Sequence, residues 1–201
     1  MNKYTGLSAT YLKETNLRVA AGRFRKELLR DERRTLGRYD GRFEGIDSDA
    51  AGENPETDPS DTAISAAFTA AFNDYIVREL HYPSDMPYRV SANSIADWDW
   101  KHKVQGQQRP LPVPYVAGDI AETMRVNPHL QLLSANGYFD LATPFFATEY
   151  DLEHMQIDPK LRANLHFSYY PSGHMVYLNV DALKQLKQDL AGFYDQAAPN
   201  R

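Results

Sequence analysis

The most restrictive feature of this sequence is that its last seventy residues predict a sheet of only two strands. The apolar run His129–Ala135 and the alternating, aromatic segment Asn164–Tyr170 have the composition of strands. Helical patterns follow them at Pro144–Met155 and at Asp181–Gln196, where Asp181 is the expected N-cap. This alternating order indicates parallel pairing in an α/β sheet. Because two strands do not make a stable sheet alone, we expect exposed strand edges.

Near the N-terminus, the sequence predicts a basic helix followed by an acidic loop. Apolar residues recur at helical spacing over Asn16–Arg34, with Asn16 as N-cap. We interpret the Arg- and Lys-rich side of this helix as a solvated face, with a docking face for an acidic partner as the alternative. The segment Gly45–Asp61 is acidic and nearly free of large apolar residues. Its Asp47-x-Asp49 pattern lacks the remaining ligands of a calcium loop, so we expect a solvated loop.

A second helix is predicted over Thr62–Leu80, with Ser60 or Asp61 as N-cap. Residues 81–114 show no clean period and predict irregular structure, and Val116–Arg125 predicts a short helix. Three large aromatic residues in and beside the irregular segment are expected to be buried packing anchors, with a place in a substrate cleft as the alternative: Trp98, Trp100 and Tyr115.

We divide the chain into a mostly helical region, residues 1–125, and part of an α/β core, residues 126–201. A net charge of -5 without a large basic block disfavours nucleic acid as a partner, and no apolar stretch is long enough for a membrane span. The absence of cysteine excludes thiolate catalysis and Cys-ligated metals. Asp151 and His154 lack a third ligand and His166 is expected to be packed or at the surface, so we expect no metal and no cofactor.

An acid and a histidine follow the two predicted strands. The first strand leads into Asn136–Asp140 and the second into Pro171–His174. Catalytic groups of open α/β sheets lie just beyond the carboxyl ends of the strands, so Asp140 and His174 should meet within about 2.6–3.2 Å. A carboxylate beside an imidazole fixes its tautomer and offsets the charge that the ring gains with a proton. On spacing alone, a turn-forming aspartate and a packed histidine are the alternatives.

The motifs around both residues resemble those of the serine carboxypeptidases, peptidases with an α/β-hydrolase fold. NGYFDLATP, at Asn136–Pro144, fits the family's aspartate motif, and SGHMVY, at Ser172–Tyr177, contains its Gly-His-Met-Val motif. The helix at Asn16–Arg34 and the GIDSDAAGE loop also resemble bacterial members, in which they belong to a helical cap. The resemblance covers essentially the whole chain. It implies a partial α/β-hydrolase sheet, formed by its last strands and C-terminal helix, preceded by a helical cap or insertion.

In the resembling enzymes a serine attacks the last peptide bond of a peptide substrate, and histidine shuttles the proton. The resemblance therefore makes His174 the base and Asp140 its orienter. Its substrate-binding candidates are Met175, which would line the pocket for the departing residue or else be a core methionine, together with Gly173 and Tyr138. Two positions depart from the family, Tyr138 where many members have a second Asp and Tyr177 where many have Pro. Both departures concern substrate preference.

The family's nucleophile is absent, because no G-x-S-x-G occurs in the sequence. Neither Ser8, with Thr10 in place of the second glycine, nor Ser134, in the predicted strand, can form the elbow. We therefore expect the C-terminal portion of a serine carboxypeptidase, inactive alone, whether a truncated product, a processed subunit or a pseudoenzyme. Its partner would be the missing N-terminal half. The alternative is a non-catalytic protein that binds a peptide or partner. Related enzymes are often exported, but this chain shows no signal peptide pattern.

Overall fold

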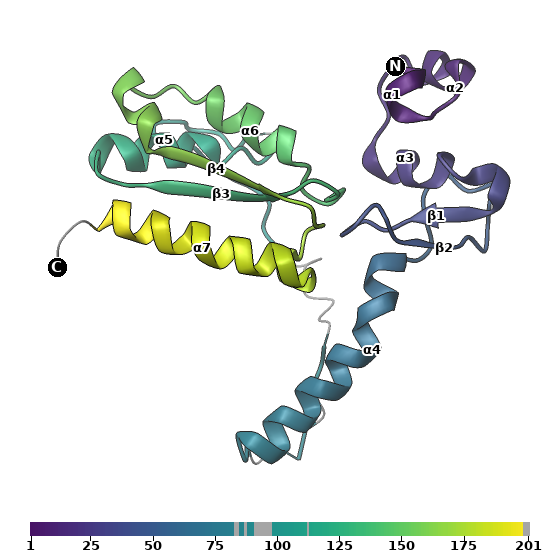
Figure 1. Cartoon of the computed structure of the whole chain (residues 1–201). Coiled ribbons are helices and arrows are strands. Elements are labelled where there is room, and N and C mark those ends of the chain that lie inside the picture. The colour runs from purple at the N-terminus through teal and green to yellow at the C-terminus, as the bar shows by residue number, and fades with distance from the viewer. Residues whose placement is uncertain (83–84, 87, 91–97, 112, 199–201) are drawn as a thin grey trace.

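The structure is a computed structural model, and it describes every residue except 83–84, 87, 91–97, 112 and 199–201. Figure 1 shows an N-terminal part, a projecting helix and a C-terminal part. The helices are α1 (Asn2–Thr5), α2 (Ala9–Glu14), α3 (Ala21–Glu27), α4 (Pro59–Asp74), α5 (Ala117–Val126), α6 (Phe145–Glu153) and α7 (Val180–Ala197). The strands are β1 (Arg34–Leu36), β2 (Glu44–Ile46), β3 (Leu132–Gly137) and β4 (Leu165–Tyr170). The prediction of a mixed helix-and-sheet protein is confirmed.

The C-terminal part is a three-layer arrangement around β3 and β4. The two strands pair in parallel, from Leu132 opposite Leu165 to Gly137 opposite Tyr170, as the sequence predicted. Helices α5 and α6 cover one face of this sheet and α7 covers the other (Figure 1). Most of α5 precedes the predicted boundary at residue 125, but its Met124 is fully buried in the core with residues of α6 and the sheet. In the described residues the sheet has only these two strands.

Two predicted N-caps are wrong, because each helix begins earlier than the apolar pattern suggested. In α4 the cap is Asp58, whose carboxylate accepts the backbone N–H of Ser60 (3.0 Å). A proline at the first helical position favours this start, so the predicted caps Ser60 and Asp61 lie inside the helix. In α7 the cap is Asn179, whose side chain accepts two backbone N–H groups, and the predicted cap Asp181 lies in the first turn.

The predicted helix Asn16–Arg34 is wrong at both ends, since α3 spans only the middle of it. Asn16 and Leu17 have φ angles of 52° and 61°, in the left-handed region, so a right-handed helix cannot begin there. After α3 the chain forms a short 3₁₀ helix, Arg30–Glu32, and enters β1. Strand β1 pairs with β2 in an antiparallel hairpin that the sequence analysis did not predict.

The predicted solvated basic face is wrong at Arg25 and Lys26, which are buried, whereas Arg18, Arg33 and Arg34 are exposed. The acidic loop of the same chain covers Lys26. Lys26, on α3, is fully buried. Its ammonium donates hydrogen bonds to Asp47 Oδ1 (2.7 Å), to Glu56 Oε1 (3.1 Å) and to the carbonyl oxygen of Asp49. Asp47 is buried as well, so the loop is not solvated at this position. The acidic partner of the basic helix is therefore a segment of its own chain.

The Lys26 ammonium and the carboxylates that surround it stabilise each other. Burial alone lowers the pKa of Lys26, but hydrogen bonds and attraction from Asp47 and Glu56 outweigh it and leave the pKa above its ordinary value. The pKa of Glu56 is lowered to about 2, first by its interaction with Asp47 and then by the hydrogen bond from Lys26. Asp47 Oδ2 is buried without a hydrogen-bond partner among the described residues. The Lys26 ammonium is therefore the main compensation for the buried Asp47 charge.

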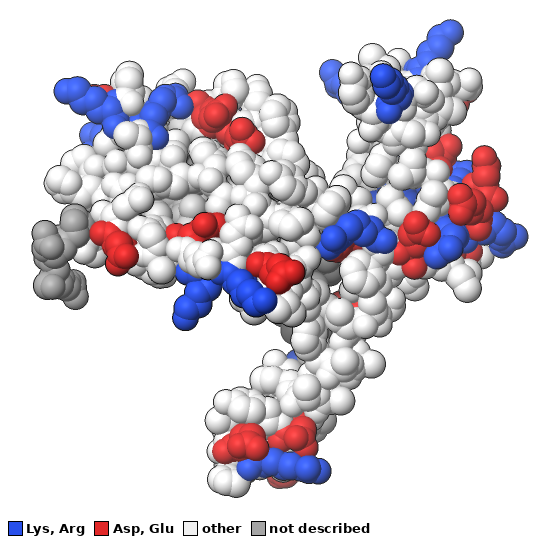
Figure 2. Space-filling view, in the orientation of Figure 1, with Lys and Arg blue, Asp and Glu red and all other residues white. Residues whose placement is uncertain are grey.

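Helix α4 projects from the rest of the molecule and is almost uncharged along its length. No charged residue occurs from Thr62 to Asn73, and Figure 2 shows charge only at the far tip of this arm. Phe68, Phe72 and Tyr75 are all exposed. The whole chain exposes 14905 Å², whereas a compact monomer of 22.9 kDa exposes about 9600 Å². The described structure thus leaves much apolar surface uncovered.

The aromatic anchors predicted near residue 100 are not buried. Trp98 is 66% exposed and Trp100 is 59% exposed, and Tyr115 is also exposed. Of the predicted irregular segment 81–114, residues 83–84, 87, 91–97 and 112 lie outside the described residues. Among the helices that the structure describes, none combines the length and the apolar character needed to cross a membrane.

We expect Asp47→Ala to lower the free energy of unfolding by about 3–5 kcal/mol, because it leaves the Lys26 ammonium buried without its main partner. Urea denaturation measures this change. The matched control is Glu53→Ala, which removes the exposed Arg23–Glu53 ion pair (2.6 Å) and should change the stability by less than about 1 kcal/mol. Equal effects of the two substitutions would contradict a buried ionic cluster.

The lowered pKa of Glu56 predicts a specific loss of stability in acid. Because this pKa, about 2, lies below the value of about 4.3 expected in the unfolded chain, Glu56 contributes stability above pH 5 that disappears as the pH falls toward 2. Wild-type protein should therefore lose more stability over this range than Glu56→Gln, as measured by urea denaturation at each pH. Parallel profiles for the two proteins would show that Glu56 is not coupled to the cluster.

Candidate active site

The parallel pairing of β3 and β4 brings Asp140 and His174 together. Each residue lies in the loop that follows its strand, and the two strands end side by side at Gly137 and Tyr170. The Asp140 Oδ2 and His174 Nδ1 atoms are 2.8 Å apart. This distance lies inside the hydrogen-bonding range expected from the sequence, so the predicted contact is confirmed.

Asp140 is buried and fixed by its own loop. Its Oδ1 atom accepts the backbone N–H groups of Ala142 (2.7 Å) and Thr143 (2.9 Å). Its Oδ2 atom accepts the hydroxyl of Thr143 (2.7 Å) in addition to the imidazole of His174. Both carboxylate oxygens of Asp140 thus act as acceptors, for four hydrogen bonds in all. These bonds hold the carboxylate in place beside the histidine.

This arrangement determines which nitrogen of the neutral His174 ring carries the proton. Because Asp140 accepts at Nδ1, that nitrogen carries the proton and Nε2 keeps its lone pair. The His174 side chain is 41% exposed, and its Nε2 has no hydrogen-bond partner in the part of the chain that the structure describes. The hydroxyl of Thr143 lies 3.2 Å from Nδ1, on the protonated side of the ring, so it is not placed to be a nucleophile activated by Nε2. The site is therefore an exposed base with a buried orienting carboxylate.

Two glycines allow the loops of the site to approach each other closely. A Cβ atom added at Gly137 would lie 2.1 Å from the carbonyl oxygen of Gly173 and 2.6 Å from that of Ser172. A Cβ atom added at Gly173 would lie 2.2 Å from the carbonyl oxygen of Tyr39 and 2.6 Å from Asp40 Cβ. Gly173 was predicted from the family resemblance to bind substrate. It also lies where the loop after β4, here called the histidine loop, contacts the N-terminal part.

The other two predicted substrate-binding residues flank the acid–base pair. Tyr138 follows β3, is half exposed, and stacks on Tyr169 with ring centroids 5.7 Å apart. Burial and a hydrogen bond to Glu149 raise the pKa of Tyr169 to about 12, so its hydroxyl stays protonated and donates. Met175 directly follows His174 and is half-buried. The roles of Tyr138 and Met175 toward a substrate stay predictions.

The sequence analysis missed the residues that connect β1 to β2, here called the hairpin loop (residues 37–43). This loop packs against both loops of the site. The backbone N–H of His174 donates to the carbonyl oxygen of Tyr39 (2.6 Å), and that of Gly41 donates to the carbonyl oxygen of Phe139 (2.8 Å). The Asp40–Gly41 dipeptide is a common hairpin-turn signal and could have identified the loop. Its contact with His174 spans more than 130 residues of chain and leaves no local pattern.

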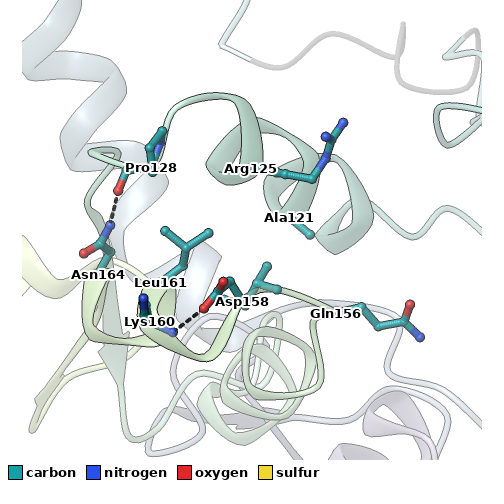
Figure 3. Close-up of a pocket in the computed structure, with 9 residues that line it drawn as sticks. Ala121, Arg125, Pro128, Gln156, Asp158, Lys160, Leu161 and Asn164 are labelled. Carbon is teal, nitrogen blue, oxygen red and sulfur yellow. Dashed lines mark hydrogen bonds between the residues drawn. The ribbon is translucent and has the colours of Figure 1, made fainter.

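The hollow shown in Figure 3 lies at the opposite end of β4 from His174. It has a volume of about 600 Å³ and lies between α5 and the 3₁₀ helix Pro159–Asn164, which precedes β4. Its lining includes Arg125 and Lys160 at the rim and Leu161 within. Because a six-residue strand separates the two ends by about 20 Å, this hollow is not part of the acid–base site.

The remaining histidines do not form a metal site. His166 Nε2 is paired with the side-chain oxygen of Gln131 (2.9 Å), and His154 Nδ1 with the carbonyl oxygen of Tyr150 (2.7 Å). Within the described ranges, no group of three acidic or histidine side chains is arranged to hold a metal ion.

Comparison with protein-family models found no match, and comparisons with curated proteins and with solved structures found none either.

We expect Asp140→Ala to lower the free energy of unfolding by about 1–3 kcal/mol, because it leaves the partly buried N–H groups of Ala142 and Thr143 without their acceptor. Asp140→Asn keeps an oxygen at the Oδ1 position and should lose less. The control is Asp151→Ala, at an exposed position of α6, which should be within about 0.5 kcal/mol of wild type. Urea denaturation of the three variants tests this order, and a neutral Asp140→Ala would exclude the hydrogen-bonded loop.

Proposed function

We propose that this chain is the acid–base portion of a serine carboxypeptidase, an enzyme that removes the last residue of a peptide. The observation that carries the proposal is the Asp140–His174 pair, in which a buried carboxylate holds Nδ1 and Nε2 is unpaired among the described residues. The Gly-His-Met-Val sequence at 173–176 supports the family and the substrate class. The nucleophilic serine is supplied by a part of the enzyme outside this sequence.

The roles of the two residues follow from their geometry. When the serine hydroxyl attacks the carbonyl carbon of the last peptide bond, His174 Nε2 takes the hydroxyl proton. Asp140 stabilises the imidazolium that forms and keeps the ring in place through Nδ1. His174 then gives the proton to the amino group of the departing residue. A water molecule, deprotonated by the same nitrogen, hydrolyses the acyl-enzyme and regenerates the serine.

We propose further that the sheet is the end of an α/β-hydrolase sheet, with residues 1–125 as the cap region. Three observations support this. The strands are parallel, the acid and the histidine follow neighbouring strands, and the chain order is acid before histidine. The two-stranded sheet and the uncovered apolar surface favour the missing N-terminal half of the enzyme as the partner.

A non-catalytic binding protein is the second candidate, and the exposed side chains of helix α4 favour it. Helix α4 and the exposed Trp98 and Trp100 present large apolar side chains that a peptide or protein partner would cover. This candidate needs no serine anywhere in the protein. The two functions are therefore distinguished by whether a nucleophile-bearing segment exists and depends on His174.

We expect the purified chain to be inactive alone, because it holds a base without a nucleophile. It should not hydrolyse blocked dipeptides and should not react covalently with a serine-directed fluorophosphonate. Mass spectrometry of the intact protein measures the labelling. A positive control is a serine hydrolase treated in parallel. Stoichiometric labelling of this chain would contradict the assignment of the nucleophile to another segment.

The decisive experiment begins with the genomic sequence upstream of the Met1 codon. We expect an in-frame G-x-S-x-G segment, and the longer polypeptide should release single C-terminal residues from a peptide, as detected by mass spectrometry. His174→Ala should lower its turnover by about 10⁴-fold or more. His166→Ala, on strand β4 that precedes the loop of His174 and paired with Gln131, is the matched control and should leave turnover unchanged. A locus without this segment would favour the binding protein.

A further inference from the structure

The hairpin loop contacts the acid–base site through backbone hydrogen bonds and through the side chains of Tyr39 and Arg42. In Figure 1 the β1–β2 hairpin reaches toward the ends of β3 and β4. Three backbone hydrogen bonds cross this contact: the N–H of His174 donates to the carbonyl of Tyr39 (2.6 Å), that of Gly41 to Phe139 (2.8 Å) and that of Leu141 to Arg38 (3.0 Å). The loop that carries His174 and the loop that carries Asp140 are therefore both bound to the hairpin loop of the N-terminal part.

Tyr39 contacts His174 at two points. Its carbonyl oxygen accepts the His174 backbone N–H, and its ring lies against the imidazole with centroids 5.4 Å apart and planes tilted by 39°. Gly173 is what allows this approach, since an added Cβ would lie 2.2 Å from the same carbonyl oxygen. Backbone and side chain of His174 are thus both in contact with one residue of the hairpin loop.

We propose that Tyr39 is a positioning residue for His174. Its carbonyl fixes the backbone of the histidine loop, and its ring limits rotation of the imidazole, so that Nδ1 points at Asp140 and Nε2 stays exposed. The inference rests on the proposed function, since it gives the hairpin loop a role in the proposed acid–base chemistry. It also makes residues 37–43 of the cap region part of the machinery that aligns the base.

Tyr39 is itself anchored to the start of α4. Its backbone N–H donates to Ser60 Oγ (3.0 Å), and the N–H of Arg38 donates to Asp58 Oδ1 (2.9 Å). The Ser60 hydroxyl in turn donates to Asp58 Oδ1 (2.6 Å). The N-terminal end of α4 therefore also fixes the hairpin loop, and loss of the Ser60 hydroxyl should loosen the loop.

A salt bridge inside the loop gives it further rigidity. Both carboxylate oxygens of Asp40 accept hydrogen bonds from the guanidinium of Arg42, at 3.0 and 2.7 Å. The same guanidinium lies over the ring of Phe139, 4.3 Å from its centroid. Asp40 is buried and the guanidinium of Arg42 is partly exposed, so one side of this two-point contact is shielded from solvent. The hairpin loop is accordingly rigid enough to hold a neighbouring residue in place.

The test measures the tautomer of His174 by ¹⁵N NMR of the full chain labelled at histidine, with His174→Gln used to assign the signal. Wild type should show one tautomer, protonated at Nδ1. In Gly173→Ala the added methyl displaces Tyr39, and the two ring ¹⁵N shifts should converge as both tautomers become populated. The control is Gly192→Ala on α7, where an added Cβ meets nothing within 4 Å. It should keep the wild-type spectrum.

A second pair of variants covers the case in which Gly173→Ala does not fold. Ser60→Ala removes the acceptor of the Tyr39 N–H, and it should shift the His174 tautomer in the same direction. Ser65→Ala, also on α4, removes only a hydroxyl that donates to the Asp61 carbonyl and should change nothing. Folding of each variant is checked by thermal unfolding, so that a mere loss of stability is not mistaken for a change at the ring.

The outcomes separate this inference from the proposed function. A single Nδ1–H tautomer in wild type that persists in the folded Gly173→Ala or Ser60→Ala variant would overturn the role of Tyr39 and leave the acid–base pair intact. A wild-type His174 with mixed tautomers would overturn both, because Asp140 would not hold the ring. A tautomer that shifts in these variants and not in the Gly192→Ala and Ser65→Ala controls supports the positioning role.

Discussion

The parallel register of β3 and β4 is the constraint on which the candidate site depends. Six residue pairs fix it, and they end with Gly137 opposite Tyr170, so the two following loops start at the same level of the sheet. A slip of one residue would turn the apolar face of one strand away from its covering helices. It would also separate Gly137 from the Gly173 carbonyl, against which it now fits with no room for a side chain. The meeting of Asp140 with His174 is thus a consequence of strand pairing.

The two ends of the molecule reach stability by different physical means. The C-terminal part buries apolar side chains such as Met124 and Met155 between helices and sheet. The N-terminal part has short elements, and a buried ammonium, that of Lys26, joins α3 to the acidic loop. Such a cluster adds little net stability compared with apolar residues, but it is costly to break because the charges of Lys26 and Asp47 are buried. It therefore specifies where the loop lies, and with it the start of α4.

The sequence was informative where structure is local and periodic. The two strands, their parallel pairing and α7 follow from apolar spacing, and the contact of Asp140 with His174 follows from the strand ends. The wrong N-caps are local errors of two or three residues, whereas the larger failures involve distant partners. Lys26 was assigned to a solvated face because charge on a helix is usually exposed, and its burial depends on Asp47, 21 residues away. Trp98 was assigned to the core because aromatic residues are usually buried, yet two thirds of its surface is exposed and its ring contact is with Trp100, which is itself exposed.

The contact of Tyr39 with His174 follows from these missed elements and changes how the chain should be divided. An exposed histidine has several rotamers, and ordering such a side chain costs on the order of 0.5–1.5 kcal/mol. The hydrogen bond to Asp140 can offset this cost, but it leaves the backbone of the loop free. One backbone hydrogen bond from His174 to the hairpin loop, worth about 1 kcal/mol, fixes that backbone, and two more fix the loop that carries Asp140. Residues 126–201 hold both reactive groups, but their alignment uses residues 37–43, so a boundary at residue 125 separates the base from the element that positions it.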